Sequence, residues 1–445
     1  MSRGTGSGQG EDLVYFSSEY DEAIKFLKSI NPSIDLTVAM PMQGLPNYVK
    51  ELSHKWIERD ITSEYPDYGL LKSACRKYWK RHGVTECSVD EVFVDTSTFS
   101  IIRSILNHYK NSNLPNSILI PSPTFGGYLD LIPKGFNIMF SEYQKNHKVD
   151  IDSIIDIIET DQPSILLLTN PVNPTGEILS EESLKKIASV CKKYSTFVIS
   201  DEIFADTARS KKPDGNTKQV EEIPSMAQFM PSHLCCAISG IGKSYGAAGL
   251  RVSYAHTHPK NISSMFFSHL SGGISSLSVK QTEAILSPPG PEEALRLDIY
   301  RLDNSLKTLE NTQFVRSKLR KINDVLSNKY GEYDDYIKIL PSDATTVALL
   351  DFSALKGKEF CGTICNSGTQ IAEILYKEMG IGVVPGEASM IPGKDMICRV
   401  GIADKQKLSN SLDKVLGAVK SSYVSGVIGQ VKSKDAKIGE AISRY

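Results

Sequence analysis

The stretch "ILLLTNPVNPTGEIL", residues 165–179, begins as an apolar run and then breaks into a turn with two Asn-Pro pairs. A short apolar run bounded by turn residues predicts a strand that is buried on both faces. Proline fixes its own backbone and pushes the preceding residue to extended geometry, so Asn170 and Asn173 are both held stiffly. The turn either serves only as a rigid end to the strand or holds an asparagine amide in position to contact a ligand.

Similar apolar runs recur on both sides of this strand, at 91–95, 117–120, 196–200, 234–239 and 251–256. Amphipathic segments separate several of them, and residues 180–194 predict a helix with Ser180 as its N-cap. Strands that alternate with helices predict an α/β domain with a mostly parallel central sheet. In such sheets ligands bind at the carboxyl ends of the strands.

A second, smaller domain is expected after a long helical region at about 292–327. Residues 345–352 and 396–403 predict strands and residues 368–380 a helix, which together indicate an α+β domain. We expect a flexible N-terminal arm at 1–34, a large domain at 35–310 and a small domain at 311–445 with a C-terminal extension. Residues 35–60 could also pack with the small domain. The extension is either an added helix or a loose tail, and residues 208–224 predict a polar loop.

Composition excludes several classes of protein. The 445 residues include 50 Lys and Arg against 52 Asp and Glu, a formal net charge of -2, so neither nucleic acid nor a membrane surface is indicated as a partner. No apolar run reaches the roughly 18 residues that span a bilayer, and the first residues lack the apolar part of a secretory signal. Eight scattered cysteines predict reduced thiols and a cytoplasmic protein. Cys361 and Cys365 could share a helix face, but without a second ligand pair no metal site is expected.

Two further polar groups follow predicted strands. In "VISDEIFAD" (198–206), Asp201 ends an apolar run, which indicates either a buried carboxylate that needs a cationic partner or a helix N-cap. In "AISGIGKSYGAAGLRVSY" (237–254), small residues surround Lys243, and Arg251 follows. Glycines let a backbone approach a ligand closely, and a lysine here could act as a charge or as a Schiff-base nucleophile. A nucleotide-binding loop is disfavoured because its first glycine is Ala237.

An amide, a carboxylate, a lysine and an arginine thus follow consecutive strands in that order. This series resembles the aspartate-aminotransferase-like enzymes of class I/II, which are fold type I enzymes dependent on pyridoxal 5'-phosphate. The likeness spans about 35–419, and its most specific parts are "NPVNPTG" (170–176) and the lysine segment through "GLR" (249–251). It implies a large cofactor-binding domain with a mostly parallel sheet flanked by helices, and a smaller α+β C-terminal domain.

The resemblance implies roles for the central residues. Lys243 would hold the cofactor as an aldimine and then move the proton at the substrate Cα. Asp201 would pair with the pyridine nitrogen, which keeps that nitrogen protonated. Asn173 would hydrogen-bond the phenolic oxygen of the ring and lie beside the substrate. Arg251 would bind the phosphate, which suits its planar pair of donors.

Other residues would complete the cofactor site by the same resemblance. Phe125, in "IPSPTFGGY" (120–128), would stack on the ring, although a core aromatic is the alternative. Ser97, Thr98 and Phe99, in "VDTSTFS" (94–100), would hold the phosphate at a strand-to-helix turn.

Two more expectations concern a partner subunit and the substrate. "YPDYGLL" (65–71) matches a segment that reaches across a dimer, so Tyr65, with Tyr68 as a close rival, would bind the phosphate of a neighbouring subunit. A homodimer is therefore expected. Arg399, in "ICRVGIA" (397–403), would bind the α-carboxylate of the substrate.

Several positions depart from the family pattern. Phe204 stands where a tyrosine usually donates to the phenolic oxygen, so Asn173 is expected to be the only side-chain donor to that oxygen. Gly240 stands where a serine usually precedes the lysine by three residues, so Ser239, one position away, is expected to bind the cofactor. Ser97 replaces the usual glycine of the phosphate turn, and Ala39 takes the expected place of a substrate-side glycine.

The leading functional hypothesis is an aminotransferase that takes an L-α-amino acid and a 2-oxo acid acceptor, through a Cα carbanion. The alternative is a lyase, cyclase or oxidase of the same fold that acts on a side-chain-functionalised amino acid. A transcription regulator that borrowed this fold is disfavoured, because only about 35 residues precede the matched region and they contain no basic recognition helix.

Overall fold

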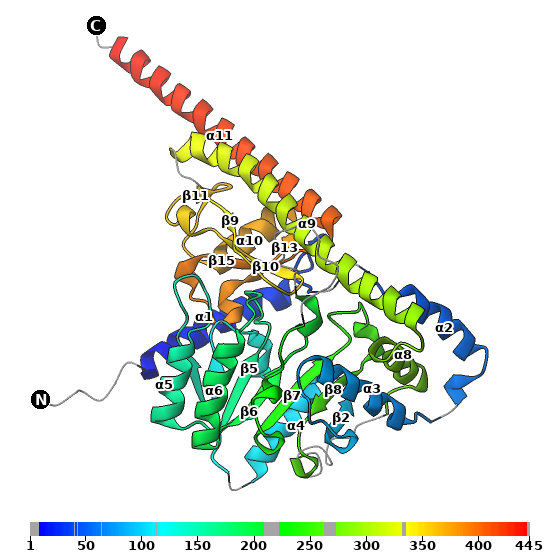
Figure 1. Cartoon of the computed structure of the whole chain (residues 1–445). Coiled ribbons are helices and arrows are strands. Elements are labelled where there is room, and N and C mark those ends of the chain that lie inside the picture. Colours follow the sequence, from blue (N-terminus) through cyan, green and yellow to red (C-terminus); the bar gives the residue numbers. More distant parts are fainter. Residues whose placement is uncertain are drawn as a thin grey trace, which may run out of the picture. The chain divides into compact units, whose positions relative to one another are not determined.

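The computed structural model describes residues 9–39, 41, 43–63, 65–112, 114–208, 222–261, 273–331 and 335–442. The chain divides into two compact units (Figure 1). Unit 1 comprises Met1–Val38, Glu310–Leu340 and Ala348–Tyr445, and unit 2 comprises Ala39–Leu309 and Pro341–Val347. The division at 309/310 lies one residue from the expected boundary, and the first 38 residues belong with the C-terminal part of the chain.

Unit 2 contains a seven-stranded sheet in the order β2-β8-β7-β6-β5-β3-β4. Only β8 runs antiparallel to its neighbours, so the mostly parallel sheet is confirmed. The strand at 165–169 and the five other expected strands are present. The sequence did not predict β4, whose side chains are mostly half-buried and whose apolar run is short. The bounds are β2 Val92–Asp95, β3 Ser117–Pro121, β4 Asn137–Ser141, β5 Ile165–Thr169, β6 Phe197–Asp201, β7 Cys235–Gly240 and β8 Ser253–His256.

Helices cover both faces of this sheet, because the strand side chains alternate between two apolar clusters. Leu166 and Leu168 of β5 pack in one cluster with α3, α5, α6 and α8, and Ile165 and Leu167 pack in the other with α4. Figure 1 shows α5 and α6 side by side along the first face. The helices of unit 2 are α2 Asn47–Ile57, α3 Tyr68–Arg81, α4 Thr98–Asn111, α5 Ile151–Asp161, α6 Glu181–Tyr194 and α8 Ser276–Leu286.

The helix starts follow from side-chain caps. Ser180 accepts a hydrogen bond from the Ser183 amide, which confirms the expected N-cap of α6. Ser97 accepts from the Ser100 amide and caps α4 in the same way. The long helix α9, Pro291–Tyr330, confirms the expected helical region, and the unit boundary falls within it.

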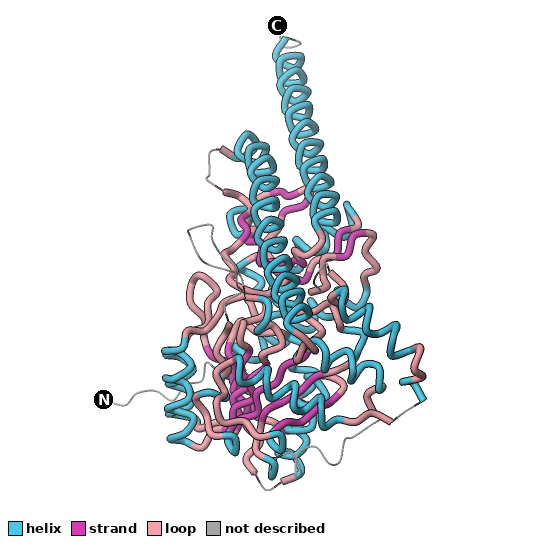
Figure 2. The backbone as a smooth tube through the Cα atoms, turned by 45° about the vertical axis from the view of Figure 1, so that its right-hand side comes forward, coloured by secondary structure: helices cyan, strands magenta, loops and turns pink. Residues whose placement is uncertain are grey.

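Unit 1 contains a four-stranded sheet in the order β14-β15-β10-β9 and two strand pairs, β1–β13 and β11–β12. Strands are magenta and helices cyan in Figure 2. The strands are β1 Ile34–Asp35, β9 Lys338–Ile339, β10 Val347–Asp351, β11 Glu359–Phe360, β12 Thr363–Ile364, β13 Ile381–Gly382, β14 Val384–Pro385 and β15 Ile397–Gly401. The helices are α1 Gln9–Ser29, α10 Gly368–Met379 and α11 Lys405–Ile442. These elements confirm the smaller α+β C-terminal domain, and the backbone of α11 continues through the extension after Ser421.

The N-terminal segment differs from the flexible arm expected at 1–34. Residues 9–29 form α1, whose Tyr20, Ala23 and Phe26 are buried. Ala23 packs in one cluster with Val384 and Ala388, so the helix is part of unit 1. The spacing of three between these apolar residues is helical, although the Gly- and Ser-rich start of the chain obscures it.

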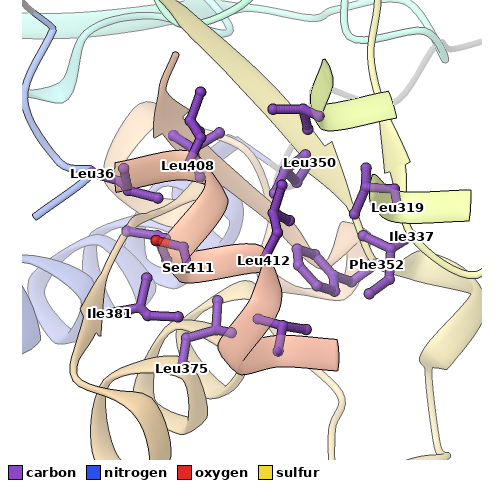
Figure 3. Close-up of a pocket in the computed structure, with 14 residues that line it drawn as sticks. Leu36, Leu319, Ile337, Leu350, Phe352, Leu375, Ile381, Leu408, Ser411 and Leu412 are labelled. Atoms are coloured by element: carbon purple, nitrogen blue, oxygen red, sulfur yellow. The ribbon is translucent and has the colours of Figure 1, made fainter. Parts of the chain in front are cut away.

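A cavity lies in the core of unit 1 (Figure 3). Its lining is apolar and includes Leu319 of α9, Leu350 of β10 and Leu412 of α11. Ser411 is the one polar side chain in the lining, and its hydroxyl donates to the Lys407 carbonyl of the same helix. The cavity is therefore a gap in core packing that offers a ligand no polar anchor.

The eight cysteines are free, and all but Cys361 are buried. Cys361 lies in the turn between β11 and β12, and Cys365 follows β12. The shared helix face considered for these two cysteines is therefore absent. In the part of the chain that the structure describes, no helix has the length and apolar character needed to cross a membrane. Most of the predicted polar loop at 208–224 lies outside the described residues.

Candidate active site

The sheet of unit 2 brings the ends of three parallel strands to one level. Thr169 pairs with Asp201 across β5 and β6, and Asp201 pairs with Ile238 across β6 and β7. Asn173 follows β5, Asp201 ends β6, and Lys243 follows β7. The amide, the carboxylate and the lysine predicted from sequence are therefore placed at one edge of the sheet, where ligands of parallel sheets bind.

Asp201 is a buried carboxylate that forms no ion pair within the described residues. It is 2% exposed, and it accepts from the Tyr128 hydroxyl at 2.8 Å and from the Ile203 amide at 3.1 Å. Burial raises the pKa of Asp201 to about 6, although both hydrogen bonds and the positive charge of Lys243 oppose this rise. Among the described residues it forms no ion pair within 4.0 Å, so a bound pyridine N–H fits this position.

Tyr128 is a site residue that sequence reasoning missed. It lies in the 3₁₀ helix η3 (Gly126–Leu131), and its hydroxyl is also 3.2 Å from Thr169 Oγ1. A carboxylate without a proton can only accept, so Tyr128 donates to Asp201 and accepts from Thr169. The signal was its spacing, because residues three apart in a 3₁₀ turn lie on the same side and Phe125 stands three positions earlier.

Phe125 lies in an aromatic group at the same edge of the sheet. Its ring centroid is 5.5 Å from that of Tyr128 in an edge-on arrangement and 5.9 Å from that of Phe99. Phe125 is half-buried and Phe99 is exposed, so the group has a face open to a planar ligand. Stacking of Phe125 on the cofactor ring stays a prediction.

The two asparagines of the opening stretch have different surroundings. The Asn170 carboxamide oxygen accepts from the Leu179 amide at 3.0 Å, and its backbone amide donates to the Asp201 carbonyl at 3.0 Å. Asn170 therefore fixes the turn to β6, which is a structural role. Both Asn-Pro bonds are cis, and Asn173 is buried. Gly176 has a positive φ of 71°, and a Cβ there would lie 2.5 Å from the Ala344 carbonyl oxygen, so only glycine fits.

The Lys243 ammonium donates to the Ala39 carbonyl oxygen at 2.8 Å. Ala39 in turn packs with Phe204 and Val347 in a small apolar cluster. Two departures from the family pattern therefore lie together, since Ala39 contacts the lysine and Phe204 packs with Ala39. Phe204 is buried, and its ring supplies no hydrogen-bond donor.

The helix α4 offers an anion site at its N-terminus. Ser97 caps the Ser100 amide at 3.0 Å, and the Thr98 and Phe99 amides have no acceptor among the described residues. Amides at a helix N-terminus favour a bound phosphate. Arg251 is exposed and donates to the Ala248 carbonyl at 3.1 Å, so its guanidinium still has donors available.

Ser239 is engaged in the interior. Its hydroxyl donates to the Glu202 carbonyl at 3.2 Å and lies 2.9 Å from the Tyr78 hydroxyl, from which it must accept. The Glu202 carboxylate accepts from Ser200 and Ser225 at 2.8 and 3.0 Å. Burial raises the pKa of Glu202 to about 7 against these hydrogen bonds, and the group links β6 to the chain that precedes β7.

Tyr65 and Tyr68 differ in exposure. Tyr65 is 100% exposed, whereas the Tyr68 hydroxyl accepts from the Ile274 amide of the same chain at 3.1 Å. A fully exposed tyrosine is available to another subunit. Its contribution to a partner's site stays a prediction.

Arg399 lies in unit 1, whereas the other predicted site residues lie in unit 2. It stands on β15 opposite Val384, is buried, and donates to the Thr37 carbonyl at 2.6 Å. Burial lowers the pKa of Arg399 to about 10, so the guanidinium keeps its charge at neutral pH. Its contact with a substrate carboxylate stays a prediction.

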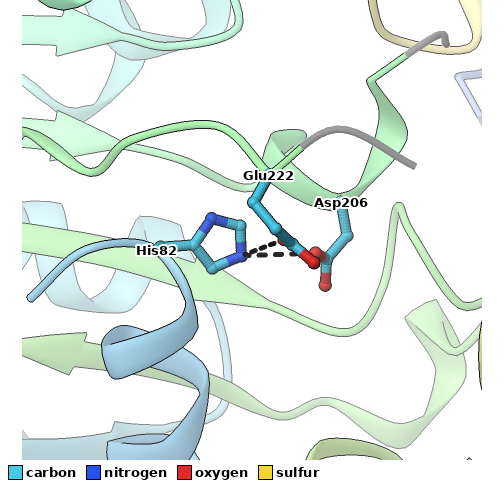
Figure 4. A group of neighbouring side chains, drawn as sticks. All are labelled: His82, Asp206 and Glu222. Carbon is cyan, nitrogen blue, oxygen red and sulfur yellow. Dashed lines mark hydrogen bonds and ion pairs between the residues drawn. The ribbon is translucent and has the colours of Figure 1, made fainter. Parts of the chain in front are cut away.

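A charge cluster joins His82, Asp206 and Glu222 (Figure 4). Arg81 donates to both Asp206 oxygens at 2.8 and 2.9 Å, and Arg301 bridges Asp206 and Glu222 at 3.1 and 2.9 Å. Although burial raises the pKa of Asp206, the charges of Arg81 and Arg301 hold it well below its usual range. Because two guanidinium groups occupy these carboxylates, the cluster is a salt-bridge network and a poor site for a metal ion.

The same network reaches the lysine turn. The Tyr245 hydroxyl donates to Asp206, and Tyr245 stands two residues after Lys243. Sequence reasoning missed the cluster because its members are far apart along the chain and carry no motif spacing. It ties the end of α3, the chain after β6, the lysine turn and α9 to one buried carboxylate.

Comparison with known proteins agrees with this geometry. The family model described as aminotransferase class I and II matches residues 34–414. A probable aspartate/prephenate aminotransferase of Rickettsia conorii is 25% identical over 368 residues, which cover 81% of this chain and 84% of the relative. An L-serine phosphate decarboxylase of Campylobacter jejuni is 27% identical over 255 residues, which cover 55% of this chain and 61% of the relative.

A solved structure shows the fold. The aspartate aminotransferase of Thermus thermophilus with maleate superimposes with a TM-score of 0.71 at 17% identity, covering 94% of this chain and all of that one. The chain therefore has the aspartate aminotransferase fold.

Proposed function

This chain belongs to the class I and II aminotransferase family, and from that membership we propose that it is a pyridoxal 5'-phosphate-dependent aminotransferase. The amino donor is an L-α-amino acid and the acceptor is a 2-oxo acid. The chain's distant relatives include aminotransferases and one decarboxylase, so the family alone fixes neither the reaction nor the substrate.

One observation carries the proposal. Asn173, Asp201 and Lys243 follow three neighbouring strands at one edge of the sheet, and Asp201 is buried there without an ion pair among the described residues. A carboxylate buried in this way is stabilised by a cation that arrives with a ligand. The protonated ring nitrogen of pyridoxal 5'-phosphate is such a cation.

The other residues proposed to hold the cofactor follow strands of the same sheet. Asp201 binds the ring nitrogen and keeps its proton, and Asn173 donates to the phenolic oxygen. The amides of Thr98 and Phe99, with Arg251, bind the phosphate. When bound, the cofactor supplies a ring that takes up the electron pair left when a bond at the substrate Cα breaks.

The reacting protons are handled by Lys243. Its Nζ, freed from the Ala39 carbonyl, accepts the Cα proton of the substrate and returns it at the next step. Arg399 binds the substrate carboxylate with a guanidinium that stays charged at neutral pH. Phe125 packs on the ring and orients it.

We further propose that the enzyme is a cytoplasmic homodimer. Tyr65, fully exposed in one chain, would bind the phosphate in the partner's site. The free cysteines are compatible with a reducing compartment. The substrates are small molecules, and no nucleic acid or membrane partner is proposed.

A lyase is the second candidate, because a decarboxylase is among the chain's relatives. Both reactions begin with the same bound amino acid and differ in which atoms leave the substrate. An aminotransferase transfers the amino group to the cofactor, whereas a lyase releases ammonia or carbon dioxide and regains the original cofactor.

The test is a panel of L-amino acids added singly to the holoenzyme without a 2-oxo acid. An aminotransferase is expected to release at most one 2-oxo acid per site and to leave the aminated cofactor, which chromatography identifies after acid denaturation. Continuous turnover with the original cofactor recovered would replace the aminotransferase by a lyase.

Covalent attachment supplies an independent measurement. Borohydride treatment of the holoenzyme is expected to add the reduced cofactor to Lys243, which intact-mass and peptide analysis would detect. Lys243→Ala should not gain this mass, whereas Lys185→Ala, an exposed lysine of α6, should gain it as the wild type does. Attachment at a different lysine would overturn the site.

A further inference from the structure

Gly240 and Ser253 face each other across two antiparallel strands. They are register partners at the end of β7 and the start of β8. A Cβ built on Gly240 would lie 2.9 Å from the Ser253 hydroxyl oxygen and 3.1 Å from the Val252 carbonyl oxygen. A serine at 240, where the family usually has one, therefore has no room, and a hydroxyl from the neighbouring strand already stands beside that place.

The two faces of the sheet separate Ser253 from Ser239. Ile238 and Ala255 pack in the cluster that contains α4, whereas Ala237 and Tyr254 pack in the cluster that contains α3. Side chains alternate along a strand, so Gly240 and Ser253 face α4. Ser239 faces α3, where its hydroxyl contacts Tyr78.

The Ser253 side chain is largely buried, and its hydroxyl is unused by the described residues. The residue is 6% exposed, and among the described residues its hydroxyl makes no hydrogen bond. A hydroxyl that is not engaged by the protein can donate to a ligand that reaches it.

Groups that bind anions come close to Ser253 in strand register and along the chain. Ser253 pairs with Asp95 of β2, and α4 begins three residues after Asp95 with the amides of Thr98 and Phe99. Arg251 stands two residues before Ser253. The Asp95 carboxylate accepts from Thr96 and Ser100, which turns it toward its own loop.

We propose that Ser253 donates its hydroxyl to the phosphate of the cofactor, in place of the serine that the family carries three residues before the lysine. This inference rests on the proposed function, because it assigns a residue of the same cofactor site. It replaces Ser239, whose hydroxyl is engaged with Glu202 and Tyr78, as the serine expected to bind the cofactor.

The test compares the affinities of the apoprotein for pyridoxal 5'-phosphate and for pyridoxal, which lacks the phosphate. Their ratio measures how strongly the protein recognises the phosphate. Ser253→Ala is expected to lower the ratio about tenfold, the effect of losing one hydrogen bond to a charged group, with pyridoxal affinity unchanged. Ser104→Ala, a buried serine of α4 whose hydroxyl bonds only to the Ser100 carbonyl, should leave the ratio unchanged.

A swap of the two residues tests the position of the hydroxyl. Gly240→Ser alone is expected to weaken phosphate recognition, because the new side chain collides with Ser253. Gly240→Ser combined with Ser253→Gly removes the closest of these contacts. The Val252 carbonyl and the Ile203 side chain then need to move by only a few tenths of an ångström, and the variant is expected to restore most of the ratio. A structural role for Ser253 would predict no such rescue.

Three outcomes overturn the inference. An unchanged ratio in Ser253→Ala would show that the hydroxyl does not bind phosphate. A reduced ratio in Ser239→Ala, with Ser253→Ala normal, would assign the role to Ser239. A wild-type protein that binds neither compound would overturn the proposed function itself, and so remove the inference with it.

Discussion

The hydroxyl of Tyr128 donates to the carboxylate of Asp201 at 2.8 Å. A donor stabilises the ionised carboxylate, so Tyr128→Phe should raise the pKa of Asp201 above about 6. We expect kcat/KM in the variant to fall about tenfold at mildly acidic pH and less at alkaline pH, where the carboxylate is ionised in both proteins. Tyr109→Phe, a buried tyrosine of α4, is the matched control. Parallel pH profiles for wild type and Tyr128→Phe would contradict the prediction.

Phe204 packs against Ala39, whose carbonyl accepts from Lys243. Because Phe204 has no hydroxyl to stabilise the deprotonated linkage between Lys243 and the cofactor, the holoenzyme should stay yellow to unusually high pH. Phe204→Tyr should lower the pKa of that linkage by about one pH unit, the effect of one neutral hydrogen bond. A spectral titration measures both. Loss of the yellow absorbance near neutrality in the wild type would refute the prediction.

Asp206 is surrounded by Arg81, Arg301 and His82. Asp206→Ala removes the fully buried carboxylate that faces both guanidinium groups and leaves the buried Arg301 with Glu222 as its counter-charge, so the free energy of unfolding should fall by about 3 to 5 kcal/mol. Lys185→Ala, which removes an exposed pair with Glu181, should change it by less than about 0.5 kcal/mol. Urea unfolding followed by circular dichroism measures both. Equal stability losses would mean that the buried network contributes no more than a surface pair.

Glu387 is buried in unit 1 and accepts from the Thr369 amide at 2.9 Å. Burial, with the negative charge of Glu19, raises its pKa to about 7. The folded protein therefore holds a proton that the unfolded chain releases near its ordinary pKa, so stability from this group falls as pH rises from about 4.5 to 7. Glu387→Gln should flatten that slope and stabilise the protein by about 2 kcal/mol above pH 7. An unchanged slope in urea unfolding across this window would contradict the assignment.

The proposed role of Tyr65 in the partner's site can be tested by mixing two inactive variants. If it acts in the partner's site, inactive Tyr65→Ala and Lys243→Ala chains should complement each other when refolded together. Each mixed dimer then holds one intact site, so random pairing should restore roughly a quarter of the wild-type activity. Tyr68→Ala in place of Tyr65→Ala tests the rival residue. A mixture as inactive as its parents would place the tyrosine's action within its own chain or outside the site.

Much of unit 2 could be read from local patterns. The strands that carry Asn173, Asp201 and Lys243 are short apolar runs with polar exits, and buried parallel strands give the clearest such signal. β4 escaped because its side chains are only half-buried, and α1 escaped because a Gly- and Ser-rich start precedes its helical spacing.

The missed site residues share a different cause. The contacts of these residues, Tyr128, Asp206 and Ser253, are with partners far away in the sequence. No local spacing of residues predicts such contacts. The face that Ser239 adopts depends on the alternation of β7, which only the packing of its neighbours fixes. Long-range register was therefore the information that the sequence lacked.

The pairing of Gly240 with Ser253 also has an evolutionary consequence. The hydroxyl can be carried by either strand, but two serines would overlap, because a Cβ at 240 lies 2.9 Å from the Ser253 oxygen. Descendants of a common ancestor should therefore exchange the two residues together, as Ser–Gly or Gly–Ser, and seldom keep serine at both. At this pair of positions selection would then preserve the location of a hydroxyl oxygen, which a serine on either strand can supply.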